Sequence, residues 1–164
     1  EIDCSVLAAL GGAIAWIFKP LGWGNWQAAV ASITGLVAKE NIVGTLGILY
    51  GGGDPSVYAT IAGAFTQLAG FSFLTFNLLC APCFAAIGAI KREMNNAKWT
   101  WFAIGYQCGF AYVVSFIIYH IGLLCQGTFN VVTVIAIAAL VGLVYLVVRK
   151  NPYDETHLTQ KVRM

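Results

Sequence analysis

Lys39 and Glu40 are the residues whose types and position most clearly suggest chemistry in this sequence. They lie in the middle of an apolar run from Trp26 to Tyr50, which is long enough to cross a bilayer as a helix. Ionisable side chains at that depth are energetically costly and usually serve a function. We expect Glu40 to face an ion path, with Lys39 tuning the carboxylate or holding a structural ion pair. The alternative is that both side chains snorkel or pair for structural reasons alone.

The spacing around Glu40 adds a packing surface. Adjacent residues of a helix point about 100° apart, so Lys39 and Glu40 cannot pair with each other and each needs a partner elsewhere, unless the helix breaks locally. Gly44 and Gly47 follow Glu40 at helical spacing. They predict a groove of small residues that another backbone could approach closely.

A second group with chemical potential is the segment from Cys80 to Cys83. Pro82 has no N–H and clashes with the carbonyl of Leu78, and a carbonyl freed inside a membrane needs a partner. Asn77 lies one turn before Cys80, so thiols, an amide and a bare carbonyl could together hold a transition-metal ion in transit. Two alternatives remain: a redox dithiol of Cys80 and Cys83, or a proline kink lined by small apolar thiols.

A polar stripe follows later in the chain. The pattern i, i+4, i+7, i+11 places its members on one helical face, which we expect to point into the bundle. These residues are Cys108, Tyr112, Ser115 and Tyr119.

The composition shows what must position these residues. Of the 164 residues, 59% are hydrophobic and only 10% are charged, against about 25% charged in a soluble domain. The chain is therefore predicted to be an all-α, polytopic membrane protein with about four spanning helices plus short interfacial or broken helices. Nothing in the sequence favours binding to nucleic acid, and no P-loop is present.

The apolar runs give the individual elements. Ser5–Phe18 is too short to span, and Val57–Ala69 reads as an interfacial helix. The predicted spans are Trp26–Tyr50, Phe71–Ile90, Trp99–Leu124 and Val131–Val148.

The basic residues set a predicted topology. They flank the spans at Lys91, Arg92, Lys98, Arg149 and Lys150, which the positive-inside rule places in the cytoplasm together with the C-terminus. The chain begins with Glu1 and not with methionine, so we expect it to be a part of a longer protein.

Several separated motifs, between about residue 7 and residue 122, resemble the C-terminal part of the FeoB family of ferrous iron transporters in order and spacing. They are Pro20–Gln27, Thr34–Glu40, Val43–Leu46, Ala81–Ala85, Ala89–Glu93, Trp99 and Gly105–Gln107.

The resemblance implies an organisation. Family members are multi-pass proteins of the bacterial inner membrane with an N-terminal GTPase domain and two Gate-type repeats. Residues 1–56 and 57–98 would form the two parts of the second Gate repeat, 99–148 two further spanning helices, and 149–164 a cytoplasmic tail. The implied partners are the lipid bilayer, the GTPase domain and the first Gate repeat of the same protein. Homo-oligomerisation is left open.

The resemblance also implies roles for individual residues. Gly35, Lys39 and Glu40 match the family motif around Ala-Lys-Glu, and Pro82 and Cys83 match its Pro-Cys motif, whose cysteine is a proposed iron contact. The implied function is Fe²⁺ transport, with Fe²⁺ as the cargo and a transient path formed by four side chains. We expect these to be Cys83, Glu40, Cys80 and Asn77.

The resemblance assigns no enzymatic step and no resident cofactor to this part of the protein. GTP and Mg²⁺ would act only through the N-terminal domain. Two other functions remain as alternatives: a membrane thiol–disulfide oxidoreductase that uses Cys80 and Cys83, and a Gate-type transporter of nucleosides or another solute.

Overall fold

Helices form every regular element in the described part of the chain, which is residues 6–51, 57–81, 83–128 and 130–149 of a computed structural model. The predicted all-α class is therefore confirmed. Pro82, the segment 52–56 and the tail 150–164 lie outside the described residues. The elements are α1 (Val6–Phe18), the short 3₁₀ helix η2 (Lys19–Leu21), α2 (Trp26–Thr34), α3 (Asn41–Gly51), α4 (Val57–Ala64), α5 (Gln67–Leu79), α6 (Phe84–Met94), α7 (Ala97–Cys125) and α8 (Val131–Val148).

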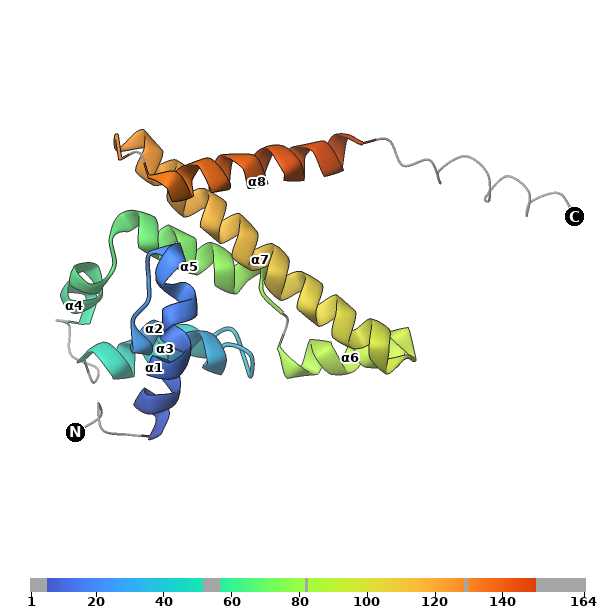
Figure 1. The fold of residues 1–164 in the computed structure, drawn as a ribbon. Coiled ribbons are helices and arrows are strands. Elements are labelled where there is room, and N and C mark those ends of the chain that lie inside the picture. Colours follow the sequence, from blue (N-terminus) through green and yellow to red (C-terminus); the bar gives the residue numbers. More distant parts are fainter. Residues whose placement is uncertain (1–5, 52–56, 82, 129, 150–164) are drawn as a thin grey trace, which may run out of the picture.

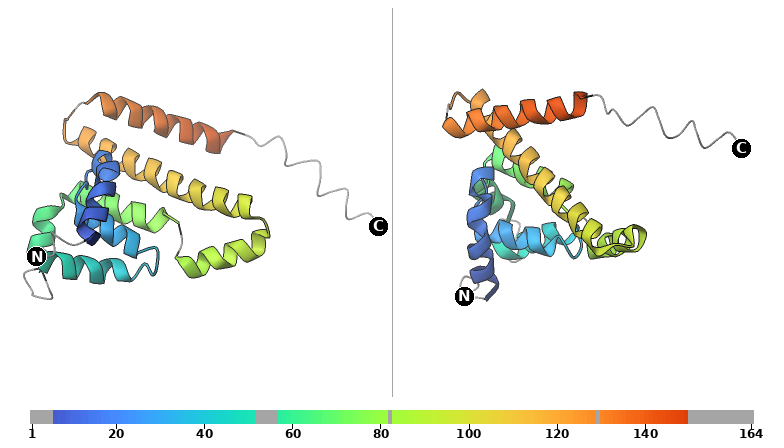
Figure 2. Two further views of the ribbon diagram at one scale, coloured as in Figure 1. Left: turned by 60° about the horizontal axis from the view of Figure 1, so that its bottom comes forward. Right: turned by 45° about the vertical axis from the view of Figure 1, so that its right-hand side comes forward.

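The long helix α7 organises the molecule (Figure 1). Helix α5 packs along it, and α6 folds beside the first turns of α7. Helices α1, α2 and α3 form a cluster on the side of α5, while α8 returns from the far end of α7 (Figure 2). The buried residues of α8 are Thr133 and Ala136, so α8 packs through its first turns and leaves the rest of its apolar surface exposed.

Three segments of the described chain are long and apolar enough to cross a membrane: Gln67–Met94, which contains α5 and α6, then α7, and then α8. A fourth arises if α1 with η2 and α2, which are bent by 100° relative to each other, count as one span. This agrees with a multi-pass membrane protein of about four spans.

The predicted span Trp26–Tyr50 is wrong as a single helix. Helix α2 ends at Thr34 and α3 begins at Asn41, and the loop between them carries Lys39 and Glu40. The Oγ1 atoms of Thr34 and Thr45 lie 3.1 Å apart and tie the two helices together. Ile42 packs onto Gly35, where an added Cβ would lie 2.6 Å from Ile42 Cδ1. The physical reason for the break is that a loop gives the charged residues access to partners that a continuous apolar helix would deny them.

The groove of small residues on α3 remains open. A Cβ added at Gly44 or Gly47 would meet no atom within 4 Å. No segment of the described chain therefore packs against this groove.

An aromatic cluster joins the N-terminal region to α5. The ring of Trp23 stacks on Phe18 with centroids 4.3 Å apart and meets Phe73 edge-on at 4.9 Å. Phe76 completes the cluster, 5.2 Å from Phe18. This packing holds the turn after η2 against the helix that leads to the candidate site.

Gly22 occupies the tightest position in that turn. Its φ is +88°, and an added Cβ would collide with the ring of Tyr119 on α7. We expect Gly22→Ala to lower the free energy of unfolding by about 2–4 kcal/mol, because backbone strain and overpacking add. Thermal unfolding of the detergent-purified protein measures this. Gly127→Ala is the matched control, since its φ is +84° but no atom lies within 4 Å of the added Cβ. Equal losses in the two variants would contradict the packing argument.

Candidate functional site

The candidate site is the break between α5 and α6. Helix α5 ends at Leu79, and Cys80 follows in an extended conformation as its C-cap. Cys83 is the N-cap of α6, and the N–H of Phe84 donates to the carbonyl of Leu36 at 3.0 Å. The loop between α2 and α3 thus meets the break directly. The position of the break agrees with the proline in the sequence.

Lys39 is the residue of that loop that reaches the break. Its Nζ donates to the carbonyl of Leu78 at 3.0 Å and to the carbonyl of Cys80 at 3.4 Å. The Leu78 carbonyl, which Pro82 was expected to free, therefore has a cationic partner. The C-terminal end of a helix carries partial negative charge, so an ammonium is well placed there. The carbonyl oxygens at the break thus bind a cation, and this cation is the ammonium of Lys39.

Helix α7 contributes a residue that the sequence analysis did not include in the site. The sulfur atoms of Cys80 and Cys108 lie 3.5 Å apart. Cys108 begins the polar stripe, and the rest of this stripe points inward as predicted: Ser115 is fully buried, and the hydroxyl of Tyr112 donates to the carbonyl of Ile17 at 2.8 Å. The inward direction of this stripe was the available signal for Cys108.

Three other residues were predicted to belong to the site: Asn77, Cys83 and Glu40. They take no part in the hydrogen bonds from Lys39 or in the sulfur contact between Cys80 and Cys108. Asn77 lies on α5, and its Nδ2 donates to the carbonyl of Phe73 at 2.8 Å within the same helix. Cys83 is half-buried at the start of α6. The side chain of Glu40 is exposed on the loop between α2 and α3. The reason is that Lys39 occupies the carbonyl-rich end of α5, where a carboxylate would meet oxygen atoms of like partial charge.

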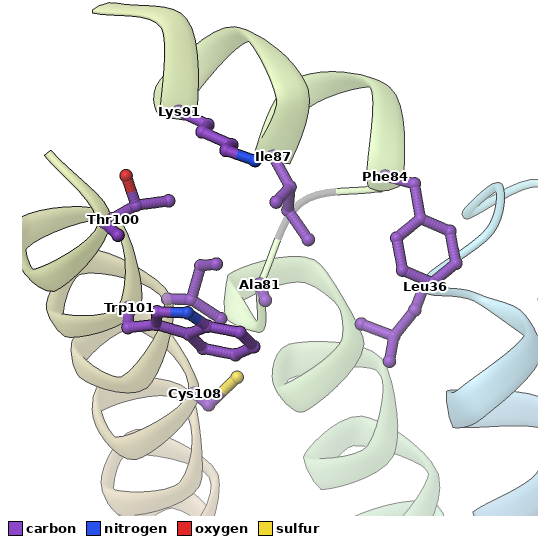
Figure 3. A pocket seen from close by; sticks show the side chains of 10 residues that line it. Leu36, Ala81, Phe84, Ile87, Lys91, Thr100, Trp101 and Cys108 are labelled. Carbon is purple, nitrogen blue, oxygen red and sulfur yellow. The ribbon is translucent and has the colours of Figure 1, made fainter. Parts of the chain in front are cut away.

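A cavity of about 390 Å³ opens beside the break, between α6 and α7 (Figure 3). Its walls are mostly apolar, with Lys91 at one end and Cys108 at the other. The remaining lining residues are Leu36, Ala81, Phe84, Ile87, Ala97, Thr100, Trp101 and Ile104. Within the described residues, no three His, Cys, Asp or Glu side chains gather into a metal-binding group.

Comparisons with known proteins agree with this architecture. The model of the Gate family, described as nucleoside recognition, matches residues 2–97. No solved structure matches the chain significantly. The chain is 38% identical over 122 residues to the Fe(2+) transporter FeoB of Staphylococcus aureus, which covers 74% of the chain and 18% of that relative.

Two further relatives come from distant organisms. The Fe(2+) transporter FeoB of Methanocaldococcus jannaschii is 40% identical over 118 residues, which covers 72% of the chain and 17% of the relative. A fusion of Fe(2+) transport protein A with Fe(2+) transporter FeoB from Porphyromonas gingivalis is 34% identical over 135 residues, covering 73% and 16%. The chain thus spans less than a fifth of the length of these relatives. Because the Gate model covers more than half of the chain and these relatives are FeoB proteins, the chain belongs to the Gate family and to its FeoB members.

Proposed function

We propose that this chain is the C-terminal membrane part of a GTP-dependent Fe²⁺ transporter of the bacterial inner membrane, and that the break between α5 and α6 lines the path of the ion. The observation that carries the proposal is the pair of carbonyls of Leu78 and Cys80, which already accept a cation, the Lys39 ammonium. The names of the relatives support Fe²⁺ as the cargo. The GTPase domain with its GTP and Mg²⁺ and the first Gate repeat belong to the rest of the full-length protein, and the C-terminus is cytoplasmic.

The proposed path combines hard and soft ligands. Cys83 and Cys80 supply sulfur, Asn77 an amide oxygen, and Glu40 a carboxylate that offsets the charge of the ion. Fe²⁺ tolerates both kinds of ligand because it is borderline in softness. Lys39 and the ion repel each other and compete for the same carbonyls, so passage requires the ammonium to move away from Leu78.

The experiment is Fe²⁺ uptake by the full-length transporter in proteoliposomes. We expect Cys83→Ser and Glu40→Gln each to slow uptake roughly 10-fold or more, because even outer-shell changes at metal sites have effects of that size. Cys125→Ser is the matched control, since Cys125 is exposed at the far end of α7. Normal uptake by both variants would refute the assignment of these residues, whereas no uptake by the unmodified transporter would refute the function.

Transport of a nucleoside is the alternative that the Gate description suggests. The cavity beside the break is large enough for a small solute, but its walls are mostly apolar. A nucleoside needs hydrogen-bond partners for its hydroxyl groups and its base, and leaving them unpaired is costly. Thr100 and Lys91 are the only side chains in the described lining with strong hydrogen-bonding groups besides the indole of Trp101. A cation path is therefore the better-supported function.

A further inference from the structure

Cys80 and Cys108 form a thiol pair that connects two helices. Their sulfur atoms lie 3.5 Å apart although the residues are 28 positions apart in the sequence, and both side chains are half-buried. The fold holds the pair in place. The Cys80 N–H donates to the carbonyl of Phe76 at 2.8 Å, and its own carbonyl accepts from Lys39. Helix α5 is fixed to α7 by Ser72, whose hydroxyl donates to the carbonyl of Ser115 at 3.3 Å.

The geometry favours Cys80 with Cys108 over Cys80 with Cys83. A disulfide needs sulfur atoms about 2.05 Å apart, and a 3.5 Å gap closes by small rotations of the two side chains. The spacing of Cys80 and Cys83 would bring their thiols onto one face only if the helix continued, and in the structure it ends at Leu79. In the described structure, the sulfur of Cys80 contacts the sulfur of Cys108 on α7.

We infer that Cys80 and Cys108 are a redox modification site, at which a hydroperoxide converts the two thiols into a reversible disulfide. Cys108 lines the 390 Å³ cavity (Figure 3), so its sulfur is the one that a small hydroperoxide reaches first. The sulfur of Cys108 attacks the peroxide, the O–O bond breaks, and a sulfenic acid and an alcohol form. The sulfur of Cys80 then displaces the hydroxyl, which leaves as water, and the S–S bond forms. Two thiols lose two electrons and the hydroperoxide gains them.

The disulfide would have a consequence at the break. It would fasten the end of α5 to the middle of α7 and remove the Cys80 thiol from the proposed ion path. This consequence rests on the proposed function, whereas the formation of the disulfide does not. Oxidation of the pair should therefore stop Fe²⁺ uptake, and reduction by a dithiol should restore it.

The direct test is differential alkylation of the full-length protein in membranes, followed by peptide mass spectrometry. After treatment with cumene hydroperoxide, we expect a peptide that joins Cys80 to Cys108 and that disappears on addition of dithiothreitol. In a Cys108→Ser variant, no peptide should join Cys80 to Cys83, and Cys125 should stay alkylatable throughout. The inference is overturned if Cys80 and Cys108 remain separately alkylated, if they oxidise to sulfinic acids without joining, or if Cys80 is joined to Cys83.

The second measurement is Fe²⁺ uptake before and after the same treatment. Uptake should fall in proportion to the fraction of protein carrying the Cys80–Cys108 bond, and Cys108→Ser should show the same rate before and after. If the Cys80–Cys108 disulfide forms and Fe²⁺ uptake does not fall, the inferred effect of the disulfide on transport is wrong. Absence of uptake before treatment would refute the proposed function, and the mass spectrum would still decide whether the disulfide forms.

Discussion

Replacing Lys39 with methionine should release the C-terminal end of α5 and lower the free energy of unfolding by about 1.5–3 kcal/mol, the range for hydrogen bonds to charged groups. The methionine keeps an unbranched apolar stem of four atoms and removes the ammonium that binds the carbonyls of Leu78 and Cys80. In a lipid environment, few waters can replace the lost donor. Thermal unfolding in detergent measures the loss, and the alkylation rate of Cys80 should rise because the chain around it opens more often.

Lys98→Met is the matched control for Lys39→Met. Lys98 is exposed at the start of α7, and its backbone N–H, not its ammonium, donates to Asn96 Oδ1 at 3.0 Å. Lys39→Arg keeps the charge and should preserve part of the stability. If Lys39→Met and Lys98→Met unfold at the same temperature and expose Cys80 equally, the ammonium does not hold the break.

Replacing Trp23 with alanine should have the largest effect of any substitution considered, about 3–5 kcal/mol of unfolding free energy, which is typical of truncating a buried aromatic residue. Trp23 is only 2% exposed, and its ring contacts Phe18, Phe73 and Phe76. Its removal would leave a hole between the turn after η2 and α5. We expect a lower unfolding temperature and reduced recovery of folded protein after purification.

Two further variants separate packing from polarity at Trp23. The Nε1 atom of Trp23 is buried with no hydrogen-bond partner in the described structure, so the packing argument assigns the whole effect to the ring. Trp23→Phe should therefore retain most of the stability. Trp16→Ala, at a position that is 65% exposed, should change stability little. A loss in Trp23→Phe as large as that in Trp23→Ala would contradict the packing argument.

The long apolar runs predicted much of the fold, because a bilayer imposes a minimum length and every backbone group must be satisfied internally. The predicted spans Phe71–Ile90, Trp99–Leu124 and Val131–Val148 lie within the segments 67–94, 97–125 and 131–148, which are long and apolar enough to cross a membrane. The run from Trp26 to Tyr50 met the same criterion and breaks, because average hydropathy does not register that two charged residues need specific partners. The partner of Lys39 lies on another helix, and a local pattern carries no information about it.

Several residues of the candidate site could be predicted from the sequence, but the contacts between them could not. The sequence indicated that Lys39 needs a partner and that the carbonyl of Leu78 needs one, but nothing in the spacing joined the two. The pairing of Cys80 with Cys108 depends on how α5 is rotated relative to α7. Helix packing sets that rotation, and the periodicity of the sequence does not reveal it. The polar stripe that begins at Cys108 indicated that this thiol points into the bundle. It did not indicate that the thiol meets Cys80.

The bond from Lys39 to Leu78 also has a consequence for how the protein is made. The two residues are 39 positions apart, so the ammonium has no carbonyl to bind until the end of α5 has been synthesised. At about 5–20 residues per second, this interval lasts roughly 2–8 seconds. During that time, the loop between α2 and α3 must stay hydrated at the membrane surface or within the insertion machinery. We therefore expect α2 and α3 to reach their final depth only together with α5, so that this region inserts into the membrane in one concerted step.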